Sequence, residues 1–287
     1  MTAPIWAGLS AEAHEAQYNP QRSVADYQAA QRRREPRNEA ALKPIGREAD
    51  IAFGPGDLHR LDLYRPEGSG PHPVHAFLHG GYWRAQDKRN FAFIAPPLLA
   101  RGVMVAVLNY DLCPAVTLDG TVASALAGIE WLGRHVAAHG GDPARLTLSG
   151  HSAGAHLAAA ALATDWTTHG LPADLIKGAL LISGIFDPAP AMRTTVNVEI
   201  RLTDAIAARH DYERIAPRAT CPAWVMAGGD EPWQWIDQSL RYAQHIRRHG
   251  LRPGVIVSPG FHHFDIMDQY SDAGSDVSRC LAELTAI

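Results

Sequence analysis

The chain has 287 residues, of which 46% are hydrophobic and 20% are charged, and its formal net charge at pH 7 is -4. This length and composition predict a globular protein with a sizeable apolar core, built as one large domain or two small ones. The small negative charge and the lack of a lysine-rich stripe argue against nucleic-acid binding. The sequence contains no run of about 18 apolar residues, so it predicts no membrane span.

The cysteines and the first residues bear on the cellular compartment. Cys113, Cys221 and Cys280 are far apart and form no CxxC pair, so neither a disulfide framework nor a structural zinc site is predicted. The chain does not start with a basic segment followed by an apolar run, which a secretory signal requires. We therefore expect a cytoplasmic protein, whose oligomeric state the sequence does not indicate.

The predicted elements fall into two parts. Residues 1–47 are polar and helix-prone, and they predict an N-terminal helical extension. From residue 48 onward, alternating segments predict half-buried antiparallel strands, and near-continuous apolar runs predict strands buried on both faces. In chain order we expect strands at 49–54, 59–66 and 73–81, a helix at 90–102, a strand at 102–110, a helix at 121–141, a strand at 145–149, a helix at 153–166, a strand at 177–184, an irregular section at about 186–219, a strand at 223–229, a helix at 235–250, a strand at 253–259 and a last helix.

This alternation predicts an α/β fold with a mostly parallel, doubly wound sheet and helices on both of its faces. We expect one such domain over residues 48–287, with the irregular section as a small lid. Ligands of sheets of this kind bind at the carboxyl ends of the strands. Residues that directly follow strands are therefore the candidates for a functional site.

A G-x-S-x-G motif follows one of these strands. Gly150-His151-Ser152-Ala153-Gly154 stands between a predicted strand and a predicted helix, where such a motif lifts the serine hydroxyl clear of the sheet. A plain glycine-rich turn with a capping serine is the alternative. A dinucleotide-binding loop would need glycine where Ser152 stands. The context favours Ser152 as a nucleophile.

A second glycine motif, His79-Gly80-Gly81-Tyr82-Trp83, follows an earlier strand. A serine nucleophile requires hydrogen-bond donors for the oxyanion that it creates. In this kind of fold they come from the residue after the nucleophile and from a loop after an earlier strand. We therefore predict an oxyanion hole formed by the N–H groups of Gly80, Gly81 and Ala153.

An acid and a base should follow the serine in that order along the chain. Asp230 directly follows a strand and is the predicted acid; Glu231 is its neighbour, and Asp187 is expected to shape the loop above the site. His262 and His263 follow the last strand and compete as the base. Their HH-x-D pattern has no further ligand pair at metal-binding spacing, so we predict neither a metal nor a cofactor.

Over about residues 48–287 the chain resembles the α/β-hydrolase superfamily. Within it, HGGYW resembles the signature of kynurenine formamidases (arylformamidases) and their esterase-like relatives, and EAQYNPQR, GDEPWQWIDQS and HHFDIMD are similar to other segments of that family. The resemblance implies Asp230 as the catalytic acid, and it implies His263, which directly precedes Phe264, as the base. The aspartate segment is one residue longer here and carries Trp233 and Trp235 in place of smaller or charged residues.

These motifs together predict a serine hydrolase that cleaves a small aryl formamide, such as N-formylkynurenine, through an acyl-enzyme. A carboxylesterase acting on short aryl esters is the alternative, and a non-catalytic binding protein on the same fold is a distant one. The expected partner is a small-molecule amide or ester. Five aromatic residues in loops after strands are expected to line an aromatic pocket: Tyr82, Trp83, Phe186, Trp233 and Trp235.

Overall fold

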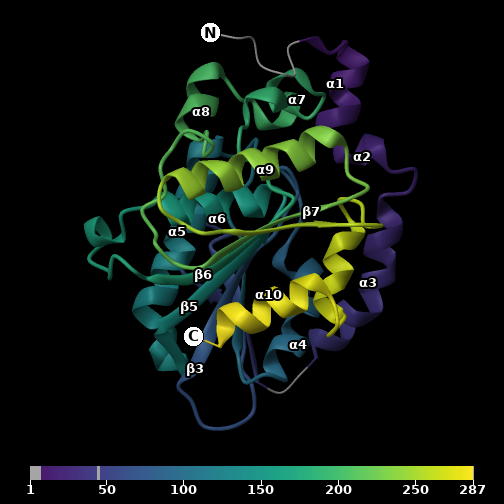
Figure 1. Cartoon of the computed structure of the whole chain (residues 1–287). Coiled ribbons are helices and arrows are strands. Elements are labelled where there is room, and N and C mark those ends of the chain that lie inside the picture. The colour runs from purple at the N-terminus through teal and green to yellow at the C-terminus, as the bar shows by residue number, and fades with distance from the viewer. Residues whose placement is uncertain (1–7, 44–45, 287) are drawn as a thin grey trace.

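A computed structural model describes residues 8–43 and 46–286. Its centre is an eight-stranded sheet in the order β1-β2-β4-β3-β5-β6-β7-β8 (Figure 1). β1 and β4 each pair antiparallel with β2, and the remaining neighbours are parallel, so the predicted α/β fold is confirmed. The strands are β1 Arg47–Ala52, β2 Arg60–Tyr64, β3 His72–Leu78, β4 Met104–Leu108, β5 Gly141–His151, β6 Ile176–Ile182, β7 Ala223–Gly228 and β8 Gly254–Ser258.

The helices include three in the predicted N-terminal extension. The α-helices are α1 Ala11–Tyr18, α2 Pro20–Ser23, α3 Gln28–Ala41, α4 Ala95–Leu99, α5 Leu118–His135, α6 Ala153–Ala163, α7 Asn197–Ile200, α8 Asp204–Arg209, α9 Trp233–Arg248 and α10 Asp276–Thr285, and the 3-10 helices are η2 Lys88–Ile94, η3 Val136–His139, η4 Trp166–His169, η5 Ala189–Arg193 and η6 Asp265–Ser271. Within the described ranges, no helix is both long and apolar enough to cross a membrane.

The core has two halves because side chains alternate across each buried strand. In β3, Val74, Ala76 and Leu78 face a cluster that includes α5, α6 and α9, while Phe77 faces the opposite cluster with α4 and α10. Figure 1 shows the sheet between these two groups of helices. The apolar, alanine-rich α6 is buried around nearly its whole circumference, as a helix without a polar face should be.

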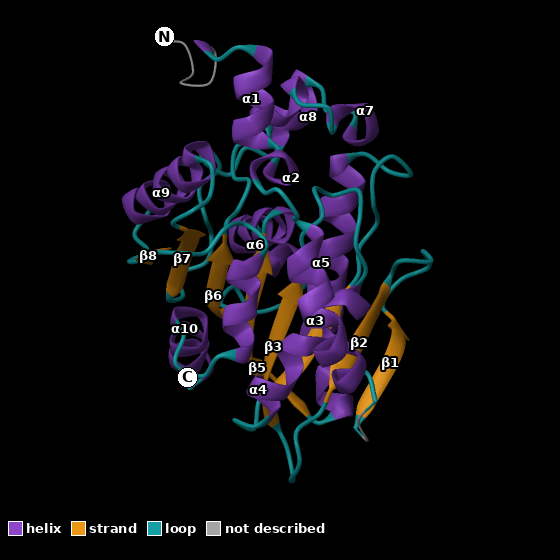
Figure 2. Cartoon of the chain, turned by 90° about the vertical axis from the view of Figure 1, so that its right-hand side faces the viewer, coloured by secondary structure: helices purple, strands orange, loops and turns teal. Residues whose placement is uncertain are grey.

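Strand register brings the predicted site loops to one edge of the sheet. Leu78 at the end of β3 is opposite Gly150 of β5, and Gly228 at the end of β7 is opposite Ser258 of β8. The loops that follow β3, β5, β7 and β8 therefore all begin at the carboxyl edge. Helices α1, α7 and α8 lie beyond this edge in Figure 2.

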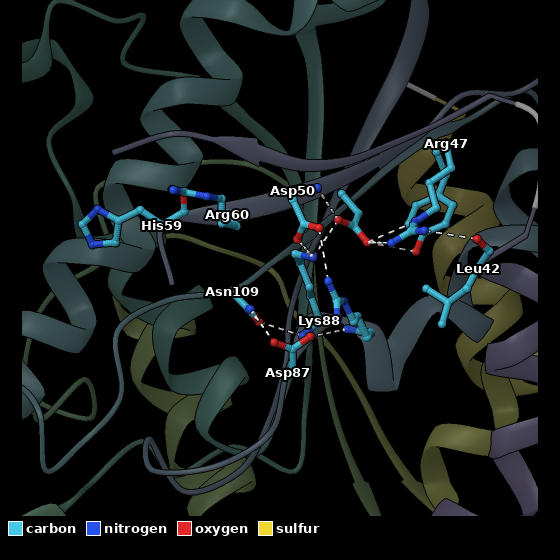
Figure 3. Close-up of polar contacts among 11 residues, drawn as sticks. Leu42, Arg47, Asp50, His59, Arg60, Asp87, Lys88 and Asn109 are labelled. Carbon is cyan, nitrogen blue, oxygen red and sulfur yellow. Dashed lines mark hydrogen bonds and ion pairs between the residues drawn. The ribbon is translucent and has the colours of Figure 1, made fainter. Parts of the chain in front are cut away.

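A buried ion-pair network holds the chain just beyond the HGGYW loop. Lys88 is 1% exposed, and its Nζ lies 2.6 Å from Asp50 Oδ1 and 2.7 Å from the fully buried Asp62 Oδ1 (Figure 3). Asn109, directly after β4, accepts a hydrogen bond from the Lys88 N–H and donates one to Asp87. Because a buried charge is costly unless it is paired, this network ties the start of η2 firmly to β2 and β4.

Candidate active site

Ser152 occupies a sharp turn between β5 and α6. Its backbone angles are φ 57° and ψ -121°, a conformation that a residue with a side chain rarely adopts. The flanking glycines make room for the turn, because a Cβ on Gly150 would lie 2.1 Å from Gly154 O, and one on Gly154 would lie 1.9 Å from Leu78 O. The G-x-S-x-G motif is thus required by close backbone packing and not merely by a loose turn.

Ser152, His263 and Glu231 form a continuous hydrogen-bonded chain. His263 Nε2 lies 3.0 Å from Ser152 Oγ, and His263 Nδ1 lies 3.0 Å from Glu231 Oε2. The histidine and glutamate side chains are 2% and 0% exposed. A carboxylate only accepts hydrogen bonds, so Nδ1–H donates to Glu231 and Nε2 is left to accept the serine proton. This is the geometry of a nucleophile, a base and an orienting acid.

The carboxylate at the histidine is Glu231, and the prediction that Asp230 takes this place is wrong. The two residues are adjacent in the tight turn after β7, in which the Asp230 N–H donates to Phe261 O and the Glu231 N–H donates to Gly228 O. This turn leaves Asp230 exposed and directs Glu231 inward. The longer glutamate side chain then spans the distance to the imidazole.

The second oxygen of Glu231 is also fixed. Oε1 accepts a hydrogen bond of 2.8 Å from the Gly228 N–H and a short one from the Ser183 hydroxyl. Ser183 follows β6 and has a φ of 51°, so its backbone is itself held in an unfavourable region. With both oxygens engaged, the carboxylate cannot rotate away from His263.

The two neighbouring histidines have separate roles. His262 Nδ1 accepts hydrogen bonds from the backbone N–H groups of Phe264 and Asp265, which stabilises the turn, whereas His263 contacts Ser152. The structure therefore places His263, as predicted, beside the serine.

His151 supports the base from the other side. Its Nε2–H donates to the His263 carbonyl oxygen at 2.8 Å, and the two rings lie 4.7 Å apart. Burial, with a further contribution from the neighbouring His263, lowers the pKa of His151 well below its ordinary value. His151 therefore stays neutral at physiological pH and holds the His263 backbone in place.

The predicted oxyanion-hole residues lie around Ser152. A Cβ on Gly80 would lie 3.1 Å from Ser152 Cβ, so the loop after β3 passes directly beside the nucleophile. Gly81 has a φ of 119°, which favours glycine. Ala153 is the first residue of α6, where backbone N–H groups have no partner within the helix. Their role as donors to an oxyanion stays a prediction.

Of the five aromatic residues predicted to line the pocket, only Tyr82 does so. Trp83 is fully buried against His156, and Phe186 stacks on Tyr242 with ring centroids 3.9 Å apart. Trp233 is 63% exposed on the surface at the start of α9.

Trp235, the remaining member, is buried and packs against the imidazole of His263 at a centroid distance of 4.4 Å. It therefore contacts the proposed base and does not line the cavity. In helix α9, Trp233 is exposed to solvent while Trp235 points toward His263.

The N-terminal extension forms part of the wall of the cavity beside Ser152, a position that the sequence did not predict. The extension contributes Asn19, Pro20, Gln21, Tyr27, Gln31 and Arg34 to the lining, whereas Val196 is the contribution of the predicted lid among the described residues. The similarity of EAQYNPQR to a family segment was the available signal. Further aromatic lining comes from Phe91 and Phe264.

Comparisons with known proteins show the family of this chain. The model of the BD-FAE family matches residues 61–175. Kynurenine formamidase of Danio rerio is 31% identical over 241 residues, which are 82% of this chain and 80% of that protein. The chain belongs to the kynurenine formamidase family. An isoprenylcysteine alpha-carbonyl methylesterase of Arabidopsis thaliana is 40% identical over 113 residues, which are 39% of this chain and 26% of that protein.

Solved structures confirm the α/β-hydrolase fold. An esterase of Pyrobaculum calidifontis superposes with a TM-score of 0.74 at 19% identity and covers 94% of both chains. Membership of the kynurenine formamidase family, together with this fold, identifies the chain as a hydrolase. Within the described parts of the chain, no group of three or more His, Cys, Asp or Glu side chains is arranged to hold a metal ion.

Proposed function

We propose that the protein hydrolyses small aryl formamides, with N-formylkynurenine as the model substrate, and that Ser152, His263 and Glu231 carry the reaction. The observation that supports this most strongly is the hydrogen-bonded chain from Ser152 Oγ through His263 to Glu231 at 3.0 Å per step. The kinship with kynurenine formamidase, over four fifths of each chain, supports the choice of substrate class.

In the proposed mechanism, His263 Nε2 takes the proton of Ser152 as its oxygen attacks the formyl carbon. Negative charge develops on the former carbonyl oxygen, and the N–H groups of Gly80, Gly81 and Ala153 are its proposed hydrogen-bond donors. His263 then returns the proton to the leaving aryl amine. Water attacks the formyl-enzyme by the same route and releases formate.

The size and lining of the cavity favour an aryl group. Its volume is about 140 Å³, close to that of a protein cavity of about 150 Å³ that accommodates benzene. Tyr27, Tyr82, Phe91 and Phe264 line it, and the rings of Tyr27 and Phe264 lie 5.5 Å apart. Tyr82 was among the predicted lining residues, whereas Tyr27, Phe91 and Phe264 were not.

A carboxylesterase acting on short aryl esters is the second candidate, and similarity to a methylesterase over the segment of 113 residues supports it. An anilide nitrogen leaves only when it is protonated, whereas the oxygen of an aryl ester depends less on protonation to leave. A measurement of kcat/KM for formanilide and for phenyl acetate, propionate and butyrate separates the two. We expect formanilide to be hydrolysed, and the ester rates to fall as the acyl chain lengthens. Inert formanilide with rapid ester turnover would contradict the proposal.

A further inference from the structure

Arg34 is a buried cation at the wall of the catalytic cavity. It lies on α3, lines the same cavity as Ser152 and His263, and is 8% exposed. Its Nε donates to the Ala30 carbonyl oxygen at 3.1 Å. Its Nη1 is buried and has no hydrogen-bond partner among the described residues. An unpaired guanidinium nitrogen in such a place is costly, so the site is incomplete without an acceptor.

Asp268, the carboxylate of the described residues that lies within 4 Å of Arg34, does not neutralise it. Asp268 Oδ1 lies 3.9 Å from Arg34 Nε, but it lies only 2.7 Å from Nη2 of Arg37, and Oδ2 lies 3.4 Å from Nη2 of Arg33. Three guanidinium groups thus share a single carboxylate. Since the shortest of these contacts belongs to Arg37, positive charge remains at Arg34.

In the described part of the chain, no other charged side chain in the cavity lining neutralises Arg34 either. No Asp or Glu of the described residues lines the cavity. Arg84 is the second cation in the lining, and its Nη1 is paired with Glu199 Oε1 at 2.6 Å. Arg84 Nε is also buried without a hydrogen-bond partner among the described residues, but Arg84 has a short ion pair and Arg34 has none.

We propose that Arg34 is the specificity-determining residue that binds the carboxylate which N-formylkynurenine carries on its side chain. This rests on the proposed function for the formamide part alone. A planar guanidinium matches a carboxylate in geometry, and charge-assisted hydrogen bonds are the stronger ones. Arg34 is a binding residue in this account and takes no part in bond cleavage.

The test uses two pairs of compounds in which only the charge differs. The first pair, 4-oxo-4-phenylbutanoate and 4-oxo-4-phenylbutanamide, has no scissile bond and is titrated calorimetrically into the Ser152→Ala variant. The second pair adds a 2-formamido group to the ring of each compound and is used to measure kcat and KM. Both are measured with Arg34 intact, with Arg34→Gln and Arg34→Lys, and with Arg37→Gln as the matched control. Arg37 lies one turn further along α3, pairs with Asp268 and does not line the cavity.

With Arg34 intact, we expect the carboxylates to bind about ten- to a hundredfold more tightly than the amides, as the loss of a charge-assisted hydrogen bond predicts. Arg34→Gln should abolish this preference through KM, Arg34→Lys should restore it in part, and Arg37→Gln should retain it. Equal binding of butanoate and butanamide, or a preference that survives Arg34→Gln, would overturn the inference. Intact preference in the binding titration with no cleavage of either formamide would instead overturn the proposed function.

Discussion

Replacement of Glu231 by glutamine should leave the fold intact and remove most of the hydrolase activity. The carboxylate accepts from His263 Nδ1 with one oxygen and from Gly228 N and Ser183 Oγ with the other. An amide has one oxygen only. If its NH₂ group faces His263, the imidazole must change its tautomer and present Nε2–H to Ser152. If the NH₂ group faces Gly228 instead, it meets the Gly228 N–H, and neither donor has an acceptor.

The magnitude follows from this conflict. Loss of the orienting carboxylate in serine proteases lowers kcat roughly 10⁴-fold, which is about 5 kcal/mol at 1.36 kcal/mol per factor of ten. We expect Glu231→Gln to lower kcat by about 10³- to 10⁴-fold, and to lower the free energy of unfolding by about 1–3 kcal/mol because a buried donor is left unpaired.

The assay is steady-state hydrolysis of phenyl acetate and formanilide, with urea unfolding to confirm that the variant is folded. Asp230→Asn is the matched control, since Asp230 is exposed and adjacent in the same turn. Its kcat should stay within about twofold of the parent enzyme. Near-normal activity of Glu231→Gln, or a large loss in Asp230→Asn, would refute the assignment of the acid.

Three other predictions test separate parts of the structure. His263→Ala should lower kcat by several orders of magnitude and His262→Ala should be much milder, because His262 only stabilises a turn; the opposite ranking in steady-state assays would contradict this. Gly154→Ala should lower the free energy of unfolding by more than about 3 kcal/mol, because its Cβ would lie 1.9 Å from Leu78 O; urea titration checks this, and a change below about 0.5 kcal/mol would be inconsistent with it. Burial lowers the pKa of His75 to about 3, so below pH 6.5 the unfolded chain binds a proton that the native state does not. The stability advantage of the parent protein over His75→Gln should therefore shrink by about 2 kcal/mol between pH 7 and pH 5, and a pH-independent difference would count against it.

The local motifs were predictable from sequence because close backbone packing restricts them. A turn in which a Cβ would lie about 2 Å from a carbonyl oxygen admits only glycine, so Gly150 and Gly154 mark the elbow around Ser152. The alternation of buried strands and helices likewise predicted the sheet. His263 was chosen over its neighbour through the family resemblance, and the structure places it at the serine.

Features that depend on tertiary contacts were not predictable in the same way. Whether Asp230 or Glu231 reaches His263 depends on a turn held by Phe261, which lies some thirty residues further along the chain. The position of Tyr27 in the cavity lining depends on how the N-terminal extension folds against the site. Trp235 and Phe264 both follow strands in sequence, yet the first packs behind the base and the second lines the cavity.

The central claim is that Ser152 cleaves an aryl formamide, and the most direct measurement is the release of formate and kynurenine from N-formylkynurenine. The parent enzyme and Ser152→Ala are compared under one set of conditions, with circular dichroism to show that both are folded. The account predicts rapid release by the parent enzyme and release at the uncatalysed rate by Ser152→Ala. Equal rates for the two proteins, or no release by a parent enzyme that hydrolyses phenyl acetate, would contradict it.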